Sequence, residues 1–169
     1  MNEGPDARAL LLADLDHEAA MTRATLSRVP ASSWDWTPHA RSFSLGGLAS
    51  HLAELPHWGV QILASAEYDF ETATPGHKVR ATLGETRERF DRHIDDLHRV
   101  LSAENAESLV APWILRRGSR VIATMTRLDA VRRLTLHHLI HHRGQLTVYL
   151  RLLDVAVPPL YGPSADEQP

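Results

Sequence analysis

Cysteine is absent from this chain of 169 residues, and its absence excludes several kinds of chemistry. A protein without cysteine forms no disulfide, builds no thiolate zinc site and offers no cysteine nucleophile of its own. Any thiol that takes part in its chemistry must therefore come from outside the chain. The rest of the composition is that of an ordinary globular protein, with 43% hydrophobic and 23% charged residues.

Long apolar runs and basic clusters are also missing. No stretch approaches the roughly 20 apolar residues that a membrane span needs, so we expect no membrane segment. The run from Ala9 to Ala13 is too short for the hydrophobic part of a signal peptide, and we expect a cytoplasmic protein. The net charge is −3, and only Arg116–Arg117 and Arg132–Arg133 come close to a basic patch. Nucleic-acid binding is therefore not expected.

Four segments show the apolar spacing of amphipathic helices, in a single domain that covers residues 1–169. Ser44 and Thr82 are suited to cap two of them, because a hydroxyl oxygen can accept a hydrogen bond from a free backbone N–H of the first turn. Pro56 lies inside the second segment and predicts a kink there. The predicted helices cover about residues 6–28, 44–66, 82–104 and 128–153.

These helices predict an all-α protein, a four-helix bundle with up-down helices and a longer irregular connection before the last helix. Residues 106–127 have no clear period and are left unassigned, although Val121–Ala123 suits a short strand or an extended hook. Pro158–Pro159 prevents continuation of the last helix. The tail over residues 158–169 is expected to dock on the bundle or to fray.

Eleven histidines stand out in this composition, and four of them fall within six residues. Residues four apart are neighbours on a helix, so this cluster contains two possible ligand pairs. At about 100° per residue, His138 and His142 share an arc with apolar residues, whereas His137 and His141 turn away from most of that arc. We therefore expect His138 and His142 to face inward.

Two imidazoles hold a divalent metal only weakly, so a usable site needs a third ligand. His51 is the best candidate because it lies on the apolar stripe of the second helix. A lone histidine on such a stripe is usually a hydrogen-bonded core residue, but the inward pair favours a metal site. Three neutral imidazoles leave the cation its charge and an open coordination position, which is typical of catalytic sites.

Two other metal-binding motifs do not fit the sequence, and the remaining histidines give no clear sign of a metal site. Zincins need a glutamate directly after the first histidine, and His138 takes that place here. Di-iron bundles need two Glu-x-x-His pairs, and the chain supplies only Glu54 with His57. His57 itself is ambiguous and could line a pocket. Five histidines are predicted to be surface or loop residues: His17, His39, His77, His93 and His98.

Three sequence segments resemble the DinB family of damage-inducible proteins, also called DinB/YfiT-like metalloenzymes. They are His51–Glu54, His142–Leu146 with the stretch Tyr149–Leu153 that follows it, and Val157–Glu167. The resemblance implies a four-helix bundle, commonly a homodimer, that holds one divalent metal through His51, His138 and His142. Some members are thiol-dependent S-transferases or isomerases that use low-molecular-weight thiols. The family name reports induction by DNA damage, which does not indicate DNA binding.

The leading hypothesis is a metal-dependent enzyme that acts on a small-molecule substrate, either as a thiol-dependent S-transferase or as a hydrolase. Imidazole ligands suit zinc, nickel, iron and copper, and affinity order alone does not decide among them; we expect zinc or nickel, with iron as a further candidate. A cation lowers the pKa of a bound water to about 7 and deprotonates a bound thiol. A low-molecular-weight thiol would replace the missing cysteine. The alternatives are a non-catalytic metal-binding stress-response protein and a helical dimer whose histidines only pack.

Three more side chains are candidates for catalytic roles. Glu54 lies one turn after His51 and could orient an imidazole or act as a base, or it could be an exposed helix carboxylate. Arg143 could bind an anionic substrate or serve the structure. Tyr149 lies near the histidine arc, so its hydroxyl could reach the site or pack in the core. The tryptophans are expected to build the core and pocket walls: Trp34, Trp36, Trp58 and Trp113.

Overall fold

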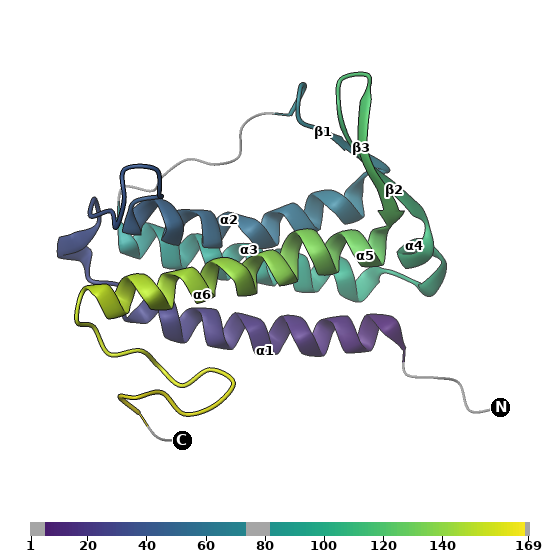
Figure 1. The fold of residues 1–169 in the computed structure, drawn as a ribbon. Coiled ribbons are helices and arrows are strands. Elements are labelled where there is room, and N and C mark those ends of the chain that lie inside the picture. Colours follow the sequence, from purple (N-terminus) through teal and green to yellow (C-terminus); the bar gives the residue numbers. More distant parts are fainter. Residues whose placement is uncertain (1–5, 74–81, 168–169) are drawn as a thin grey trace.

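Helices dominate the computed structural model, which describes residues 6–73 and 82–167 (Figure 1). Helix α2 packs against α3 and α6, and α1 packs against the same two helices from the other side. The helical elements are α1 (Ala7–Ser27), η1 (Ala31–Ser33), α2 (Leu45–Ala64), α3 (Leu83–Ala103), α4 (Ala106–Val110), α5 (Arg127–Val131), η2 (Arg132–Leu136) and α6 (His137–Leu152). The first three long helices thus match the predicted segments to within a few residues at each end.

The predicted caps explain where two of these helices begin. The Ser44 hydroxyl accepts a hydrogen bond from the Gly47 N–H at 3.0 Å, and the Thr82 hydroxyl accepts one from the Glu85 N–H at 3.1 Å. Each bond satisfies a backbone donor that has no partner within the helix. Pro56 lies inside α2 as expected, and the kink predicted there stays a prediction.

A small sheet shows that the all-α expectation was wrong in one respect. Its strands are β1 (Glu67–Asp69), β2 (Pro112–Arg117) and β3 (Arg120–Thr126), in the order β1-β2-β3. Strand β2 pairs with β1 in parallel and with β3 in antiparallel register, and the β2–β3 hairpin projects beyond the helices (Figure 1). The strand alternative for Val121–Ala123 is confirmed.

The sheet escaped prediction because its local signal is short. Only Trp113 and Leu115 of β2 are buried, which gives two inward positions instead of a sustained alternation. Its parallel partner β1 has three residues and lies more than 40 positions earlier in the chain, at Glu67 opposite Ile114. Gly118 turns the hairpin with a φ of +56°, a conformation that glycine adopts without strain.

The predicted last helix is interrupted by a π-helical turn. Between α5 and α6, η2 covers Arg132–Leu136, and the His137 N–H bonds to the Arg132 carbonyl five residues earlier. Such turns are frequent at functional sites. Because His138 and His142 both follow the turn, their four-residue spacing on one helix face is preserved.

The long helices enclose the core that the apolar stripes predicted. On α3, for example, Phe90, Ile94, Leu97 and Leu101 are all at most 4% exposed. Trp113 is the largest fully buried side chain, as expected for a core tryptophan. In the part of the chain that the structure describes, no helix is long and apolar enough to cross a membrane.

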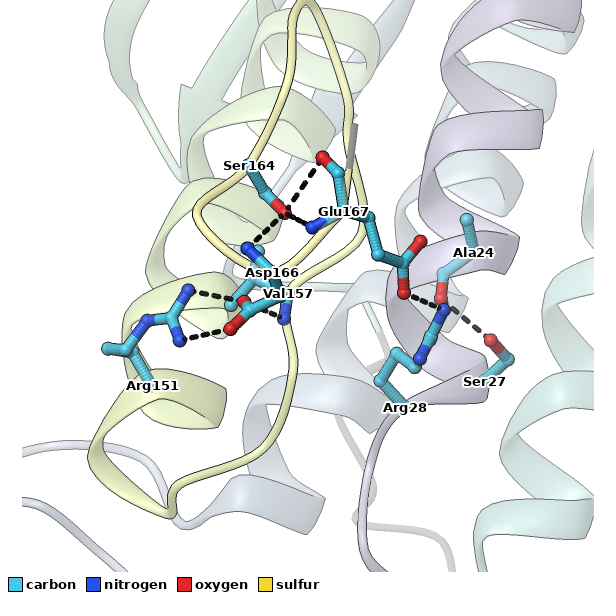
Figure 2. A network of polar contacts seen from close by, with 8 residues as sticks. All are labelled: Ala24, Ser27, Arg28, Arg151, Val157, Ser164, Asp166 and Glu167. Carbon is cyan, nitrogen blue, oxygen red and sulfur yellow. Dashed lines mark hydrogen bonds and ion pairs between the residues drawn. The ribbon is translucent and has the colours of Figure 1, made fainter. Parts of the chain in front are cut away.

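The C-terminal tail docks on the helices, so docking is confirmed over fraying for its described part. The two oxygens of the Asp166 carboxylate accept hydrogen bonds from the Arg151 guanidinium of α6 at 3.0 and 2.6 Å (Figure 2). The Val157 N–H donates to the same carboxylate at 2.9 Å. On the other side of the tail, Glu167 forms an ion pair with Arg28 at the end of α1. The tail therefore joins the last helix to the first.

Replacement of Asp166 by asparagine should weaken this docking in a pH-dependent way. The Arg151 guanidinium and the Val157 N–H lower the pKa of Asp166 to about 2, below the ordinary value of 3.8. A depressed carboxyl pKa stabilises the folded protein above the unfolded pKa, and this contribution is lost as pH falls through 4 towards 2. Asp166→Asn should therefore unfold at a lower temperature than wild type at pH 7, and the difference should shrink between pH 4 and 2.

Thermal unfolding followed by circular dichroism measures this difference. Asp95→Asn removes an exposed carboxylate from α3 and serves as the matched control, with little expected change. Equal unfolding temperatures of Asp166→Asn and wild type at pH 7 would contradict the docking role.

Candidate metal centre

Three histidines from two helices converge at one place. His51 comes from α2, and His138 and His142 come from successive turns of α6. The Nε2 atom of His138 lies 3.4 Å from that of His51 and 2.8 Å from that of His142. All three residues offer a ligand atom within 4.8 Å of the others. The structure thus brings together the three residues that the helical pattern and the resemblance selected.

The spacing of these nitrogen atoms fits a single divalent cation. In a tetrahedral site with metal–nitrogen bonds of about 2.0–2.1 Å, neighbouring nitrogens lie about 3.3 Å apart. The two measured separations, 2.8 and 3.4 Å, lie on either side of that value. Three imidazoles in this arrangement could hold one metal ion and leave a further coordination position for another molecule.

Hydrogen bonds on the far side of two imidazoles set their orientation. The Nδ1 atom of His142 lies 2.7 Å from the Gln145 amide oxygen, and an oxygen partner there requires the proton on Nδ1. His138 hydrogen-bonds the backbone of Leu134, a residue of the π-helical turn. A proton held at Nδ1 leaves Nε2 with a lone pair for a metal. Gln145 was not predicted, although its position three residues after His142 was a signal for it.

Burial favours the neutral form of His138, while two of the three histidines stay partly open to solvent. His142 is 8% exposed, whereas His51 and His138 are only partly buried. Burial lowers the pKa of His138 below its ordinary value of 6.5, the nearby His141 lowers it further, and the hydrogen bond to Leu134 opposes both. A lowered pKa favours the neutral imidazole, which is the form that binds metal.

Aromatic rings surround the three imidazoles. The Phe43 ring stacks on His51, with ring centroids 5.7 Å apart and an interplanar angle of 28°, and meets His142 edge-on at 6.4 Å. Trp58 lies 6.3 Å from His138, between ring centroids, in agreement with its prediction as a pocket wall. The centre is therefore bordered by aromatic rings from α2 and from the residue that precedes its cap.

Glu54 and Tyr149 make contacts that hold neighbouring elements in place. Glu54 forms an ion pair with Arg89 of α3 at 3.3 Å, and its side chain is only 11% exposed, so the alternative of an exposed carboxylate was wrong. The Tyr149 hydroxyl donates to the Phe43 carbonyl at 3.2 Å, and its ring meets Trp36 edge-on. The catalytic roles considered for these two residues stay predictions.

Arg143 is buried in an ion pair that links three parts of the fold. Its guanidinium is 1% exposed, lies 2.6 Å from the Glu18 carboxylate of α1 and donates to the Glu18 backbone carbonyl at 3.0 Å. Tyr161 of the tail places its ring 5.3 Å from the guanidinium carbon and donates its hydroxyl proton to the Glu18 carboxylate at 2.7 Å. Of the two roles considered for Arg143, these contacts favour the structural one.

One of the remaining histidines was misplaced by the sequence pattern. His93 was expected at the surface, but it is 5% exposed and its Nδ1 lies 2.8 Å from the Ala53 carbonyl of α2. It stacks on His57, with ring centroids 4.9 Å apart. Its place three residues after the buried Phe90 puts it on the apolar face of α3, and that spacing was the missed signal. His77 lies outside the described residues.

Comparison with known proteins finds the family that the sequence resembles and solved structures of the same fold. A profile of the DinB family matches residues 2–169. The structure of a DinB-like protein from Bacillus subtilis superposes with a TM-score of 0.68 at 18% identity, over 90% of this chain and 96% of that one. A structure assigned to the DinB family from Exiguobacterium sibiricum gives 0.68 at 21% identity, over 88% and 93%. At such identities these structures show a shared fold. No curated protein matches the chain.

Arg143→Met should destabilise the protein by about 3–5 kcal/mol, because the substitution leaves the buried Glu18 carboxylate without its counter-charge. Adding Glu18→Gln to Arg143→Met should restore part of the lost free energy of unfolding, since the unpaired charge is then removed as well. Urea denaturation of the two single variants and the double variant measures the coupling. Arg133→Met, an exposed position on η2, is the control. A fully stable Arg143→Met protein would show that Arg143 does not hold the fold together.

Proposed function

The chain belongs to the DinB family, and on this premise we propose that it is a metal-dependent enzyme with one divalent ion at His51, His138 and His142. The observation that carries the proposal is the convergence of three Nε2 atoms at a spacing that suits a single cation. The partial exposure of two of these histidines supports access for a small-molecule substrate. The proposed chemistry is thiol-dependent S-transfer or hydrolysis.

Zinc and nickel are the metals that we propose first, and iron also suits three imidazoles. When bound, such a cation supplies Lewis-acid chemistry, because it lowers the pKa of a thiol or a water at its open position. The chain contains no cysteine, so S-transfer would use a low-molecular-weight thiol as its cofactor. This is why we place thiol transfer ahead of hydrolysis.

The residues of the chain prepare the centre by position and by protonation. The Gln145 amide oxygen holds a proton on Nδ1 of His142, so that Nε2 is available to the metal. The backbone of Leu134 has the same role for His138. We assign no proton transfer to Arg143, because its guanidinium is paired with Glu18. Glu54 and Tyr149 remain the candidates for catalytic roles.

The architecture and assembly form part of the same proposal. We interpret α1, α2, α3 and the continuous α5–η2–α6 segment as a four-helix bundle, to which the β2–β3 hairpin is added. The homodimer is supported by Val148 and Leu152, which lie one turn apart on α6 and are 56% and 58% exposed. We further propose a cytoplasmic protein that binds no nucleic acid, in keeping with its net charge of −3.

Protein purified without a histidine tag should contain about one divalent ion per chain, measured by elemental mass spectrometry. His138→Ala and His142→Ala should lower metal affinity by more than the roughly 10- to 100-fold typical of losing a partner outside the ligand set. His137→Ala is the matched control, because it removes an exposed histidine next to His138 on the same helix. Metal binding that is unchanged by His138→Ala would contradict the proposed centre.

Activity is tested on the metal-loaded protein with a panel of low-molecular-weight thiols and electrophiles, followed by loss of free thiol. Turnover should disappear in His142→Ala and persist in His137→Ala. A cobalt-substituted protein should change its visible spectrum when a thiol is added. A protein that binds metal but shows neither turnover nor a spectral change would be the alternative, a non-catalytic metal-binding stress-response protein.

A further inference from the structure

The aromatic side chains beside the metal centre point to the chemical class of its ligand, an inference that rests on the proposed metal function. Trp58 follows His51 by seven residues, which is two helical turns, and therefore lies on the same face of α2. Phe43 directly precedes the cap of α2 and stacks on His51. Rings thus follow this face of α2 on both sides of the histidine.

Two aromatic side chains near the centre, Phe43 and Phe70, are partly exposed to solvent. The chain has three phenylalanines, and Phe90 is fully buried in the core. Phe43 and Phe70 are instead 43% and 37% exposed. Each exposed ring is linked to the three histidines by ring contacts, Phe43 directly and Phe70 through Trp58. Phe70 adjoins Trp58, with ring centroids 6.0 Å apart, and Trp58 in turn adjoins His138 at 6.3 Å.

Neighbouring elements hold the backbone of Phe43 and the ring of Phe70 in place. The Tyr149 hydroxyl of α6 donates to the Phe43 carbonyl. Phe70 meets Tyr68 of β1 edge-on at 5.3 Å, and the Arg117 guanidinium lies 5.7 Å from the centre of its ring. Rings that are fixed before a ligand arrives lose little conformational freedom on binding, which strengthens the contact.

A hollow lies beside Tyr68, whose ring adjoins both Trp58 and Phe70. The hollow measures about 360 Å³, and the Tyr68 ring meets Trp58 edge-on at 5.5 Å between centroids. Its volume falls at the small end of the range typical of ligand pockets. The hollow is lined by Gln61, Ala64, Ser65, Tyr68 and Ala73.

We propose that the centre takes a small molecule in which a flat aromatic ring is attached to the group that reaches the metal. The ring packs against the aromatic wall of Phe43, Trp58 and Phe70, while the polar group occupies the open metal position. Contacts between aromatic rings favour binding by roughly threefold to tenfold beyond the area that they bury. The same wall offers no such gain to a ligand that has a methyl group in place of the ring.

Two hydroxamates test this inference, because both bind metal through the same head group. Benzohydroxamate carries a phenyl ring, and acetohydroxamate carries a methyl group. Their dissociation constants are measured on zinc-loaded protein by titration calorimetry, after the zinc content has been determined. We expect benzohydroxamate to bind at least tenfold more tightly than acetohydroxamate to the wild-type protein.

Truncation of the exposed rings should reduce this preference specifically. In Phe43→Ala and Phe70→Ala the preference for benzohydroxamate should fall by roughly threefold to tenfold, while the affinity for acetohydroxamate changes little. Leu10→Ala removes a 52% exposed apolar side chain from α1 and should preserve the preference. If the rings serve only to orient the imidazoles, the variants will weaken both hydroxamates equally, and this result would overturn the inference.

Failure of the inference differs from failure of the metal centre. If zinc-loaded protein binds the two hydroxamates equally well, the proposal of an aromatic ligand is contradicted, whereas the proposed metal centre is not. Protein that takes up no zinc contradicts the proposed function and this inference together. A preference that persists unchanged in the Phe43→Ala, Phe70→Ala double variant shows that the wall is not its source, and it also overturns the proposal.

Discussion

The packing of α2 against α6 is the contact on which the candidate centre depends. It places the Nε2 atom of His51 3.4 Å from that of His138, although the two residues are 87 positions apart. His51 lies between Leu48 and Leu52, both fully buried, so the apolar stripe of α2 determines the direction of its imidazole. Because protein cores are close-packed, a rotation of α2 about its axis would have to displace these leucines.

The buried ion pair of Arg143 fixes the other half of this arrangement. Arg143 directly follows His142, and successive residues of a helix point about 100° apart. When the guanidinium of Arg143 is held by Glu18 of α1, the imidazole of His142 is directed towards α2. Tyr161 joins the same carboxylate. The buried charge thus determines the rotation of α6 and contributes to the metal centre without touching it.

The small sheet and the tail extend this scaffold in different ways. Strand β1 follows α2 closely and ends directly before Phe70, whose ring adjoins Trp58, so the sheet helps to position the aromatic wall beside the centre. The tail returns from α6 to α1. Arg151 of α6 binds the Asp166 carboxylate of the tail, and Arg28 at the end of α1 binds the Glu167 carboxylate (Figure 2). The sheet therefore shapes the surroundings of the site, whereas the tail joins the first helix to the last.

The sequence by itself determined what depends on neighbours a few residues apart. Apolar spacing, the caps at Ser44 and Thr82 and the four-residue spacing of His138 and His142 are local, and they were sufficient to predict the long helices and the three histidines. Only the tertiary structure decided which distant groups meet. Arg143 and Glu18 are 125 residues apart, so no local pattern could distinguish a substrate-binding arginine from a buried structural one. The partners of β2 and the aromatic wall were likewise decided by packing between elements, because side-chain contacts across the core are independent of separation along the chain.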